Sequence, residues 1–513
     1  MALLEGVEGG EALRGKAIFR ASRACHGLRR YGEAKAWLMK MVEEGVGGDT
    51  VEVEMRRVEA RLAEASGEVD FEGMIEELEK RKEMDRASWV GGVEKRESKD
   101  MGGGRGLFVT RALKAGEVVA VEKAFAAVLP PSSDDRQEVD EDNKRTRDGL
   151  RALRAAFADK VANKLEKNPS LVAEFAQLYA GEQEEQQSKV EEIDDAFVKS
   201  RCLLNSFDYF ASQKDAHWNA IKKPEQELPV AESKDGCMGV WITASLINHS
   251  CLPNVQQSVC GDMIILRATR DLAKDTELRL NYCGTTENVE DREEHLKQYG
   301  FVCSCPLCRC QRDTTPAMHK ARSEAYKRII ERFESDEPTD MATYFALLTT
   351  LSKTFDTDPA EEPRRILINP AINLISACSD TPAADSSLKE YVIKVGLLLL
   401  KGLGWDLKTN ASKFQVKRYG LVTDEVVAVL ADMWTAYGVT CPSIVKEVEG
   451  VLRTAYCIMV GEEATFESVY GACRPGGELE EGEGGLVGGE DMMELVRGMR
   501  ETMATGSGND GTA

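Results

Sequence analysis

The chain has 513 residues, 42% of them hydrophobic, which is enough for two or more domains with buried cores. Its 66 Lys and Arg residues stand against 88 Asp and Glu residues, so the formal net charge is -22. This balance argues against broad binding to phosphate backbones and favours a basic partner, such as a lysine-rich protein tail. The sequence shows no signal-peptide pattern, and its longest apolar run falls short of the roughly 20 residues of a membrane span. We therefore expect a soluble, unsecreted protein of the cytoplasm, the nucleus or both, with no direct nucleic-acid or membrane binding.

The first 87 residues form the first predicted domain, which is helical. Small and large apolar residues recur at helical spacing over residues 11–65, as in a tight helical hairpin. The segment LRRYGEAKAWLMKM looks like one degenerate tetratricopeptide repeat, although an ordinary helical hairpin explains the same pattern. A single repeat is too short to be stable alone, so we expect this segment to pack on another part of the chain.

The second predicted domain, residues 88–310, is rich in strands. Residues 88–131 read as strand, turn and strand, and residues 131–200 read as a charged, helical insertion. Short strands return over residues 241–282, with hairpin signals at Gly261–Asp262 and Lys274–Asp275. Residues 311–473 are predicted to form a helical domain, and residues 474–513 a disordered acidic tail rich in Gly and Glu. The predicted fold class is α+β.

Four cysteines crowd into the short segment CSCPLCRC: Cys303, Cys305, Cys308 and Cys310. In a reducing compartment such crowding indicates a metal site more than disulfides. The C-x-C-x-x-C spacing supplies three thiolates, whereas a structural zinc ion needs four ligands. The fourth ligand could be Cys310 or a distant cysteine. Buried thiols without a metal are the weaker alternative.

The stretch WITASLINHSCLPN places polar residues directly after an apolar run. Pro253 interrupts regular structure, so Asn248 and His249 could bind a ligand at this break. Taken alone, His249 could equally be a hydrogen-bonded core histidine. The glycine run MGGGRGLF is not a phosphate-binding loop, and it would let the backbone approach a ligand beside Arg105. Tyr282 ends a strand-like segment, where a lone tyrosine is more often half-buried in packing than catalytic.

These motifs, taken in their order along the chain, resemble the SET-domain protein lysine methyltransferases. The order is GRGL, CLLNSF, SLINHSCLPN, DTELRLNY and REEHLKQYGFVCSCPLC, over roughly residues 88–310. The similarity is to the SMYD-like branch, which includes the SET- and MYND-domain enzymes, and to fungal proteins that join tetratricopeptide repeats to a SET domain. The chain departs from this branch in lacking a MYND finger, because residues 126–201 contain no cysteine. The family's finger-based partner binding is therefore not carried over.

The resemblance implies a role for each matching residue. Tyr282 would stand at the methyl-transfer centre. The residues that would bind S-adenosylmethionine are Gly103, Arg105, Asn205, Ser245, Ile247, Asn248, His249 and Phe301. The ligands of a structural zinc ion in a post-SET segment would be Cys251, Cys303, Cys305 and Cys308.

The activity implied is transfer of a methyl group from S-adenosylmethionine to a lysine of a histone or another protein substrate. The helical ends would bind other proteins. A catalytically silent SET scaffold for protein–protein interaction is the alternative from another class, and a zinc-dependent interaction module without cofactor is a third. The Rubisco-directed type of SET methyltransferase is a further alternative within the enzymes, but that type lacks the C-x-C-x-x-C segment.

Overall fold

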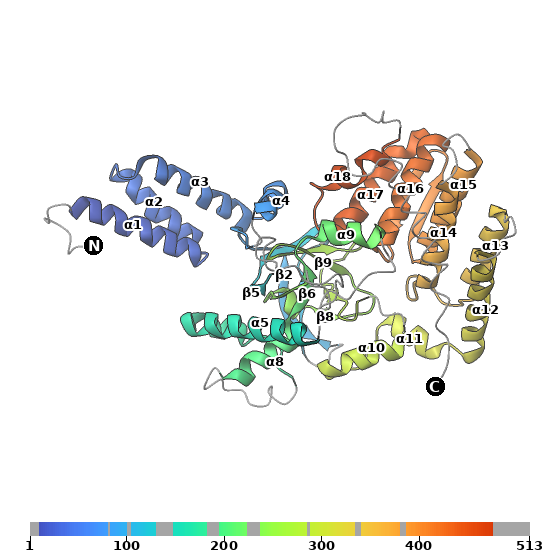
Figure 1. The fold of residues 1–513 in the computed structure, drawn as a ribbon, viewed down its shortest axis with the longest axis horizontal. Coiled ribbons are helices and arrows are strands. Elements are labelled where there is room, and N and C mark those ends of the chain that lie inside the picture. Colours follow the sequence, from blue (N-terminus) through green and yellow to red (C-terminus); the bar gives the residue numbers. More distant parts are fainter. Residues whose placement is uncertain are drawn as a thin grey trace.

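The computed structural model describes residues 10–80, 83–99, 104–129, 147–181, 194–222, 236–284, 288–333, 340–379 and 386–475. Helices from the N-terminal part of the chain lie on one side of a β-rich centre, and helices from the C-terminal part lie on the other (Figure 1). This arrangement agrees with the expected α+β class. Within the described residues, no helix is both long and apolar enough to cross a bilayer.

The N-terminal helices are α1 (Gly10–Gly27), α2 (Tyr31–Glu43), α3 (Gly48–Ala65) and α4 (Phe71–Lys80). Among them, α2 packs against both α1 and α3. Ile18, Ala34 and Leu38 are almost fully buried between α1, α2 and α3. The Ser22 hydroxyl of α1 donates to the carbonyl oxygen of Ala34 in α2 over 3.0 Å, because the small Ala34 side chain leaves room for this approach. The small side chain of Ala34 thus allows α1 and α2 to lie close together.

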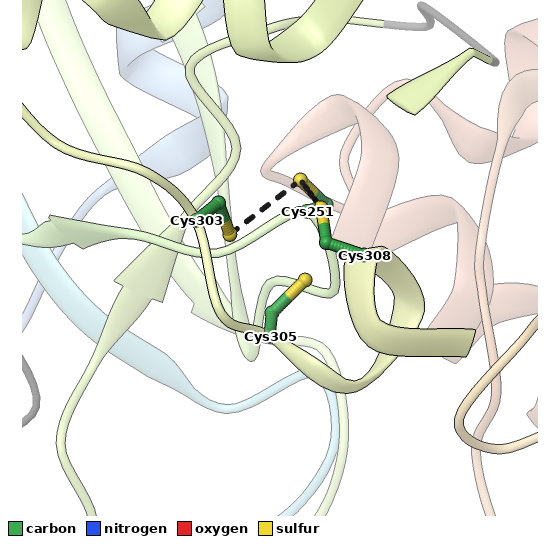
Figure 2. A group of neighbouring side chains, drawn as sticks. All are labelled: Cys251, Cys303, Cys305 and Cys308. Carbon is green, nitrogen blue, oxygen red and sulfur yellow. Dashed lines mark hydrogen bonds between the residues drawn. The ribbon is translucent and has the colours of Figure 1, made fainter. Parts of the chain in front are cut away.

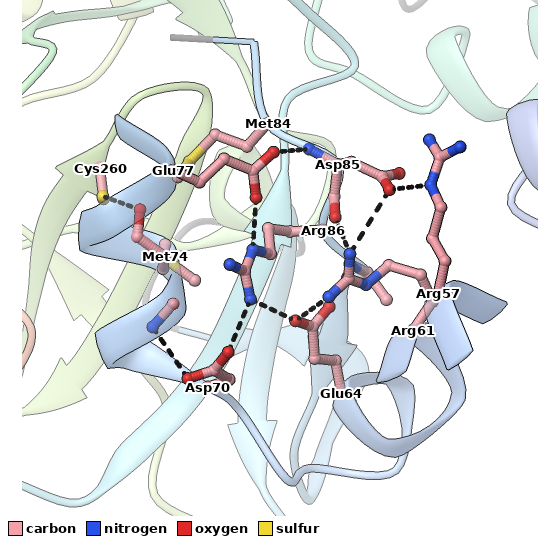
Figure 3. Close-up of polar contacts among 12 residues, drawn as sticks. Arg57, Arg61, Glu64, Asp70, Met74, Glu77, Met84, Asp85, Arg86 and Cys260 are labelled. Atoms are coloured by element: carbon pink, nitrogen blue, oxygen red, sulfur yellow. Dashed lines mark hydrogen bonds and ion pairs between the residues drawn. The ribbon is translucent and has the colours of Figure 1, made fainter. Parts of the chain in front are cut away.

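Buried charges fasten these helices to the strand-rich centre. The Arg86 guanidinium, in the segment after α4, contacts the carboxylates of Glu64 at 2.9 Å and Glu77 at 2.7 Å (Figure 3). The Asp85 carboxylate, beside it, accepts from Arg57. The next residues enter β1 (Trp89–Val90), which pairs antiparallel with β4 (Val118–Lys123). The helical segment is therefore joined to the first sheet through a short, ion-paired connection.

The centre consists of several small sheets. The four-stranded sheet has the order β1-β4-β10-β9, and the three-stranded sheet has the order β5-β7-β6. Two further strands, β2 and β3, pair with each other, and Phe108 of β3 also forms an isolated antiparallel bridge with Glu277. The bounds not yet given are β2 (Val93–Ser98), β3 (Gly104–Val109), β5 (Ala126–Val128), β6 (Phe207–Phe210), β7 (Gly236–Val240), β9 (Val255–Cys260) and β10 (Met263–Ala268).

The expected strand, turn and strand over residues 88–131 are present, but β3 and β4 do not pair with each other. Each finds a partner elsewhere in the sequence: β3 pairs with β2, and β4 with β1 and β10. The hairpin at Gly261–Asp262 forms, with Cys260 opposite Met263. The second expected hairpin was wrong. A turn does occur at Asp275, which has a positive φ of 68°, but the strand after it, β11 (Arg279–Leu280), pairs in parallel with β8 (Asn248–His249).

The described parts of the expected insertion are helical. They comprise α5 (Arg147–Lys167), η4 (Pro169–Leu171), α6 (Val172–Phe175) and α8 (Asp195–Asn205). Phe157, Val161 and Phe175 are buried in a core that these helices share with β5 and β7. Asp194 caps α8 by accepting from the backbone N–H of Phe197 over 2.7 Å. The insertion therefore has its own core against the three-stranded sheet.

Residues after the cysteine-rich segment form the C-terminal helices. Their bounds are α12 (Pro316–Phe333), α13 (Met341–Ser352), α14 (Ile368–Ser379), α15 (Ser386–Gly402), α16 (Asp424–Thr440), α17 (Val445–Val460) and α18 (Phe466–Tyr470). Trp434 and Tyr456 are fully buried among them.

The expectation that this C-terminal domain is entirely helical was wrong. A two-stranded antiparallel hairpin, β12 (Asp406–Asn410) and β13 (Lys413–Arg418), stands between α15 and α16. Its sequence carries the period-two signal of a strand, because Leu407 and Phe414 face inward while their neighbours are exposed. The residues of the predicted acidic tail lie outside the described part of the chain from 476 onward.

Candidate active site and metal centre

The parallel pairing of β8 with β11 builds the site. Asn248 lies opposite Arg279, and His249 opposite Leu280. The pair places the polar residues of the NHSC stretch beside the segment that ends at Tyr282. A break in regular structure was expected at Asn248 and His249, but these two residues form a short strand, and the chain then bends before Pro253 and β9.

Glu122 supports the segment that leads into β8. Its buried carboxylate accepts from the backbone N–H groups of Thr243 at 2.9 Å and Ala244 at 3.2 Å, at the start of η7 (Ala244–Leu246). Burial raises the pKa of Glu122 to about 6, although these hydrogen bonds act in the opposite direction. The sequence analysis did not single out Glu122, because a lone acid in an apolar strand gives no indication of its partner.

The Asn248 side chain is held between two strands. Its Nδ2 donates to the Arg105 carbonyl oxygen over 2.9 Å and to Glu277 Oε1 over 2.8 Å. The other oxygen of Glu277 accepts from Ser98 over 3.0 Å. A Cβ added to Gly106 would lie 2.2 Å from Glu277 Oε1, so the close approach of β3 requires glycine here. This is the structural role of Gly106, the last glycine of the run.

His249 connects the cysteine cluster with Tyr282. Its Nε2 lies 3.2 Å from the Cys251 sulfur, and its Nδ1 accepts from the Tyr282 backbone N–H over 3.0 Å. Accepting at Nδ1 requires the neutral ring with its proton on Nε2, directed at the sulfur. Burial lowers the pKa of His249 to about 4, in agreement with a neutral imidazole.

Tyr282 is enclosed by aromatic rings. Its ring centroid is 5.1 Å from those of His249 and Tyr299, and Phe301 packs on the other side of His249 at 5.9 Å. The Tyr282 hydroxyl donates to the Ile247 carbonyl oxygen over 2.5 Å. Burial raises the pKa of Tyr282 well above its ordinary value, so the hydroxyl stays protonated at neutral pH. It can therefore orient a polar group but cannot serve as an ionised base.

Four other residues were predicted from the sequence for the cofactor site: Asn205, Ser245, Arg105 and Gly103. The Asn205 side chain donates to the carbonyl oxygens of Tyr179 at 2.7 Å and Arg201 at 2.8 Å, and the Ser245 hydroxyl donates to the Asn205 carbonyl oxygen at 3.1 Å. Arg105 is exposed. Gly103 lies outside the described residues. The structure thus brings Ser245 and Asn205 together, with the amide hydrogens of Asn205 directed at the backbone.

Four cysteines form a compact cluster (Figure 2). The sulfur atoms of Cys251, Cys303, Cys305 and Cys308 all lie within 4.8 Å of one another. Cys251 Sγ is 3.4 Å from Cys308 Sγ and 3.9 Å from Cys303 Sγ. These separations are close to the roughly 3.8 Å between two ligands of a tetrahedral site with Zn–S bonds of about 2.3 Å. Cys310, the alternative fourth ligand, does not belong to this group.

Hydrogen bonds among the four thiols shift their pKa values in opposite directions. Those with Cys251 lower the pKa of Cys308 to about 7 and also lower the pKa of Cys305, whereas the pKa values of Cys251 and Cys303 are raised. The buried Arg292 directs Nη2 at the Cys308 sulfur over 3.6 Å and donates to Gln311 over 2.5 Å. Arg292 thus brings a positive charge to a site where four thiolates would exceed the charge of a divalent ion. Nothing in the cysteine spacing pointed to Arg292.

Comparisons with known proteins agree with this geometry. Residues 104–283 match the family described as SET domain. A fungal protein named methyltransferase, from Gibberella zeae, is 27% identical over 478 residues, covering 88% of this chain and 64% of that protein. The chain thus spans slightly less than two thirds of that relative's length.

Shorter matches join the chain to animal proteins. Mouse histone-lysine N-methyltransferase SMYD3 is 30% identical, with 29% of this chain and 32% of that protein covered. Chicken protein-lysine N-trimethyltransferase SMYD5 is 29% identical, with 20% and 26% covered.

Residues 104–283 therefore form a SET domain. In the matched segments, the chain is similar to proteins of the SMYD type. The SET domain, the α+β fold and the resemblance expected from the motifs are thereby confirmed.

Proposed function

We propose that this chain is a protein-lysine N-methyltransferase that uses S-adenosylmethionine. The observation that carries the proposal is the β8–β11 pairing, because it joins Asn248, His249 and Tyr282 in one enclosed group. The named activities of the relatives support the same reaction. A histone tail or another protein with an accessible lysine is the proposed substrate class, and the acidic net charge favours encounter with such a basic partner.

The bound cofactor would supply a methyl group on a sulfonium, whose C–S bond breaks as the lysine nitrogen forms its bond to carbon. The protein must admit the lysine as a neutral amine, because the ammonium has no lone pair. An enclosed, largely apolar site favours the neutral form by desolvation. Alignment can then supply roughly 7–11 kcal/mol of the barrier. We assign Tyr282 the orientation of the reacting groups, since its hydroxyl already points at the Ile247 carbonyl oxygen.

We assign the cofactor site to Gly103, Arg105, Asn205, Ser245, Ile247, Asn248, His249 and Phe301. Asn248 has the strongest structural support among these residues, because Glu277 and the Arg105 carbonyl oxygen hold its side-chain amide beside β3.

We assign a structural zinc ion to Cys251, Cys303, Cys305 and Cys308. The donor set fits, because four sulfur ligands at these separations suit a closed tetrahedral site. The ion would tie the segment after Tyr282 to the NHSC stretch, and His249 would keep its ring fixed against a Cys251 thiolate.

Isothermal titration of the zinc-loaded chain with S-adenosylmethionine tests the cofactor site. We expect saturable binding that is lost in an Asn248→Ala/His249→Ala variant. A folded wild-type chain that does not bind would favour the silent-scaffold alternative.

Turnover tests Tyr282 separately. The Tyr282→Phe variant should bind the cofactor as the wild type does but lose most methyl transfer to a lysine-rich protein substrate. Near-normal turnover by that variant would refute the role assigned to the hydroxyl.

A further inference from the structure

The hairpin β12–β13 presents a basic face on an acidic protein. Lys408 and Lys413 are exposed on its outer face, and Lys417 and Arg418 are exposed near its base, where the register shifts. Asp406 is the one acidic residue of the hairpin. Among the described residues, no carboxylate pairs with these four basic side chains, whereas Lys394 on the neighbouring α15 pairs with Glu390 at 3.2 Å. The hairpin therefore carries positive charge that the described part of the chain leaves uncompensated.

The last described residues lie against α16, whose C-terminal end contacts this hairpin. Pro475 packs against Gly438 of α16 so closely that an added Cβ there would lie 2.2 Å from the Pro475 Cβ. The same end of α16 supports the hairpin: the Tyr437 ring meets the Phe414 ring at 5.7 Å. The Cys441 thiol, directly after α16, donates to the Ala411 carbonyl oxygen in the hairpin turn over 2.9 Å. Gly438, which Pro475 contacts, is one residue after Tyr437 and three residues before Cys441, and both of these contact the hairpin. Pro475 therefore meets α16 within about one helical turn of the residues that support the hairpin.

The sequence that follows has the complementary charge. Residues 476–491 read GGELEEGEGGLVGGED, with six acidic residues and no basic one. An extended chain advances about 3.3–3.6 Å per residue, so the acids that begin at Glu478 can reach the hairpin. Tethering gives such a segment an effective concentration of about millimolar, which compensates for weak surface charge pairs.

We propose that the acidic segment 478–491 binds in cis to the basic face of the hairpin. The segment competes there with any acidic partner in solution, so the hairpin is shielded in the isolated chain. A nucleic acid is disfavoured as the occupant, because the net charge of -22 repels a polyanion from the molecule as a whole. The attraction is between exposed charges and weakens as salt rises.

Carbodiimide cross-linking of the full chain tests this contact, because it joins a carboxylate to a lysine amine only where the two touch. An equal mixture of ¹⁴N- and ¹⁵N-labelled protein, at low micromolar concentration, distinguishes contacts within one chain from contacts between chains. We expect Lys413 to be linked to residues 478–491 of the same isotope. The yield should fall about five- to tenfold in 0.5 M salt.

A matched pair of variants tests whether the cross-link depends on the charge of the hairpin or only on the net charge of the chain. Lys408→Gln/Lys417→Gln leaves Lys413 available as the reacting amine, and we expect it to reduce the Lys413 cross-link about five- to tenfold. Lys320→Gln/Lys327→Gln makes the same change of net charge on α12 and should leave the cross-link unchanged. All four lysines are exposed, so circular dichroism should show folded proteins.

Three results would overturn the proposal. They are links from the acidic segment to other lysines in place of the hairpin, links only between different isotopes, and a Lys413 link that both variants affect equally.

Discussion

Replacing Arg86 with methionine should weaken the attachment of the N-terminal helices to the SET domain. The Arg86 guanidinium is buried and contacts Glu64 at 2.9 Å, Glu77 at 2.7 Å and Asp70 at 3.1 Å. Burial opposes its charge, but the three carboxylates outweigh that effect and raise the pKa of Arg86 above its ordinary value. Methionine keeps much of the volume but removes the charge.

The size of the effect follows from which carboxylates lose their partner. Glu64 and Glu77 have side chains only 4% and 13% exposed, whereas Asp70 is 58% exposed and is stabilised by water in either protein. Removing one member of a buried ion pair costs about 3–5 kcal/mol. Glu64 retains Arg61 at 2.7 Å, so we expect the lower end, about 3 kcal/mol.

Hydrogen exchange measures this cost locally. The backbone N–H of Asp85 donates to Glu77 over 2.6 Å, and that of Ala87 donates to Glu64 over 2.8 Å. A loss of about 3 kcal/mol predicts that both amides exchange about 10²-fold faster in Arg86→Met. The exposed Arg56→Met variant on α3 should change them little. If Arg86→Met exchanged at the wild-type rate, the network would be shown not to hold the connection.

Three further predictions concern the site. Since burial raises the pKa of Glu122 from 4.5 to about 6, the folded chain binds the proton more tightly than the unfolded chain, and its stability falls as pH rises through that window. The difference in unfolding free energy between wild type and Glu122→Gln, from urea titrations, should therefore shrink by about 2 kcal/mol between pH 4.5 and pH 7; a constant difference would contradict this. Arg292→Met should weaken zinc binding about 10- to 100-fold in competition with a chromogenic chelator, while the exposed Arg309→Met should not; equal affinities would exclude a role for the buried charge. Glu277→Gln should lower S-adenosylmethionine affinity about tenfold in calorimetry by releasing the Asn248 amide, with zinc content unchanged; unaltered affinity would show that Asn248 needs no such anchor.

The sequence predicted the parts of the site whose chemistry is carried by residue type and spacing. Three cysteines at C-x-C-x-x-C indicated a metal centre, and the resemblance supplied Cys251 as the fourth member, which the structure brings to them. The sequence did not show that Glu277 would bind the Asn248 amide or that Arg292 would contact the cysteine cluster. A carboxylate or guanidinium has no local pattern that reveals a partner in a distant part of the sequence, as in the pairing of Arg292 with Cys308, 16 residues away.

The pairing of the strands could not be predicted from the sequence either. The apolar runs around β3 and β4 were recognisable, but their partners were not, because pairing depends on contacts between distant segments. The hairpin β12–β13 was missed although Leu407 and Phe414 alternate with polar neighbours, because the flanking helical pattern dominates that region. Local periodicity identifies an element, whereas its partner is set by the rest of the chain.

The parallel pairing of β8 with β11 also determines when the site can form during protein synthesis. Its parts lie on β3, on the NHSC stretch, at Tyr282 and on the cysteine segment that ends at Cys308. During synthesis on the ribosome, a nascent chain that stops before Cys308 lacks a ligand of the proposed metal centre. The N-terminal helices can pack much earlier, because their contacts are local. Binding of the proposed metal ion and cofactor would thus be a late event, possible only after more than half of the polypeptide has emerged.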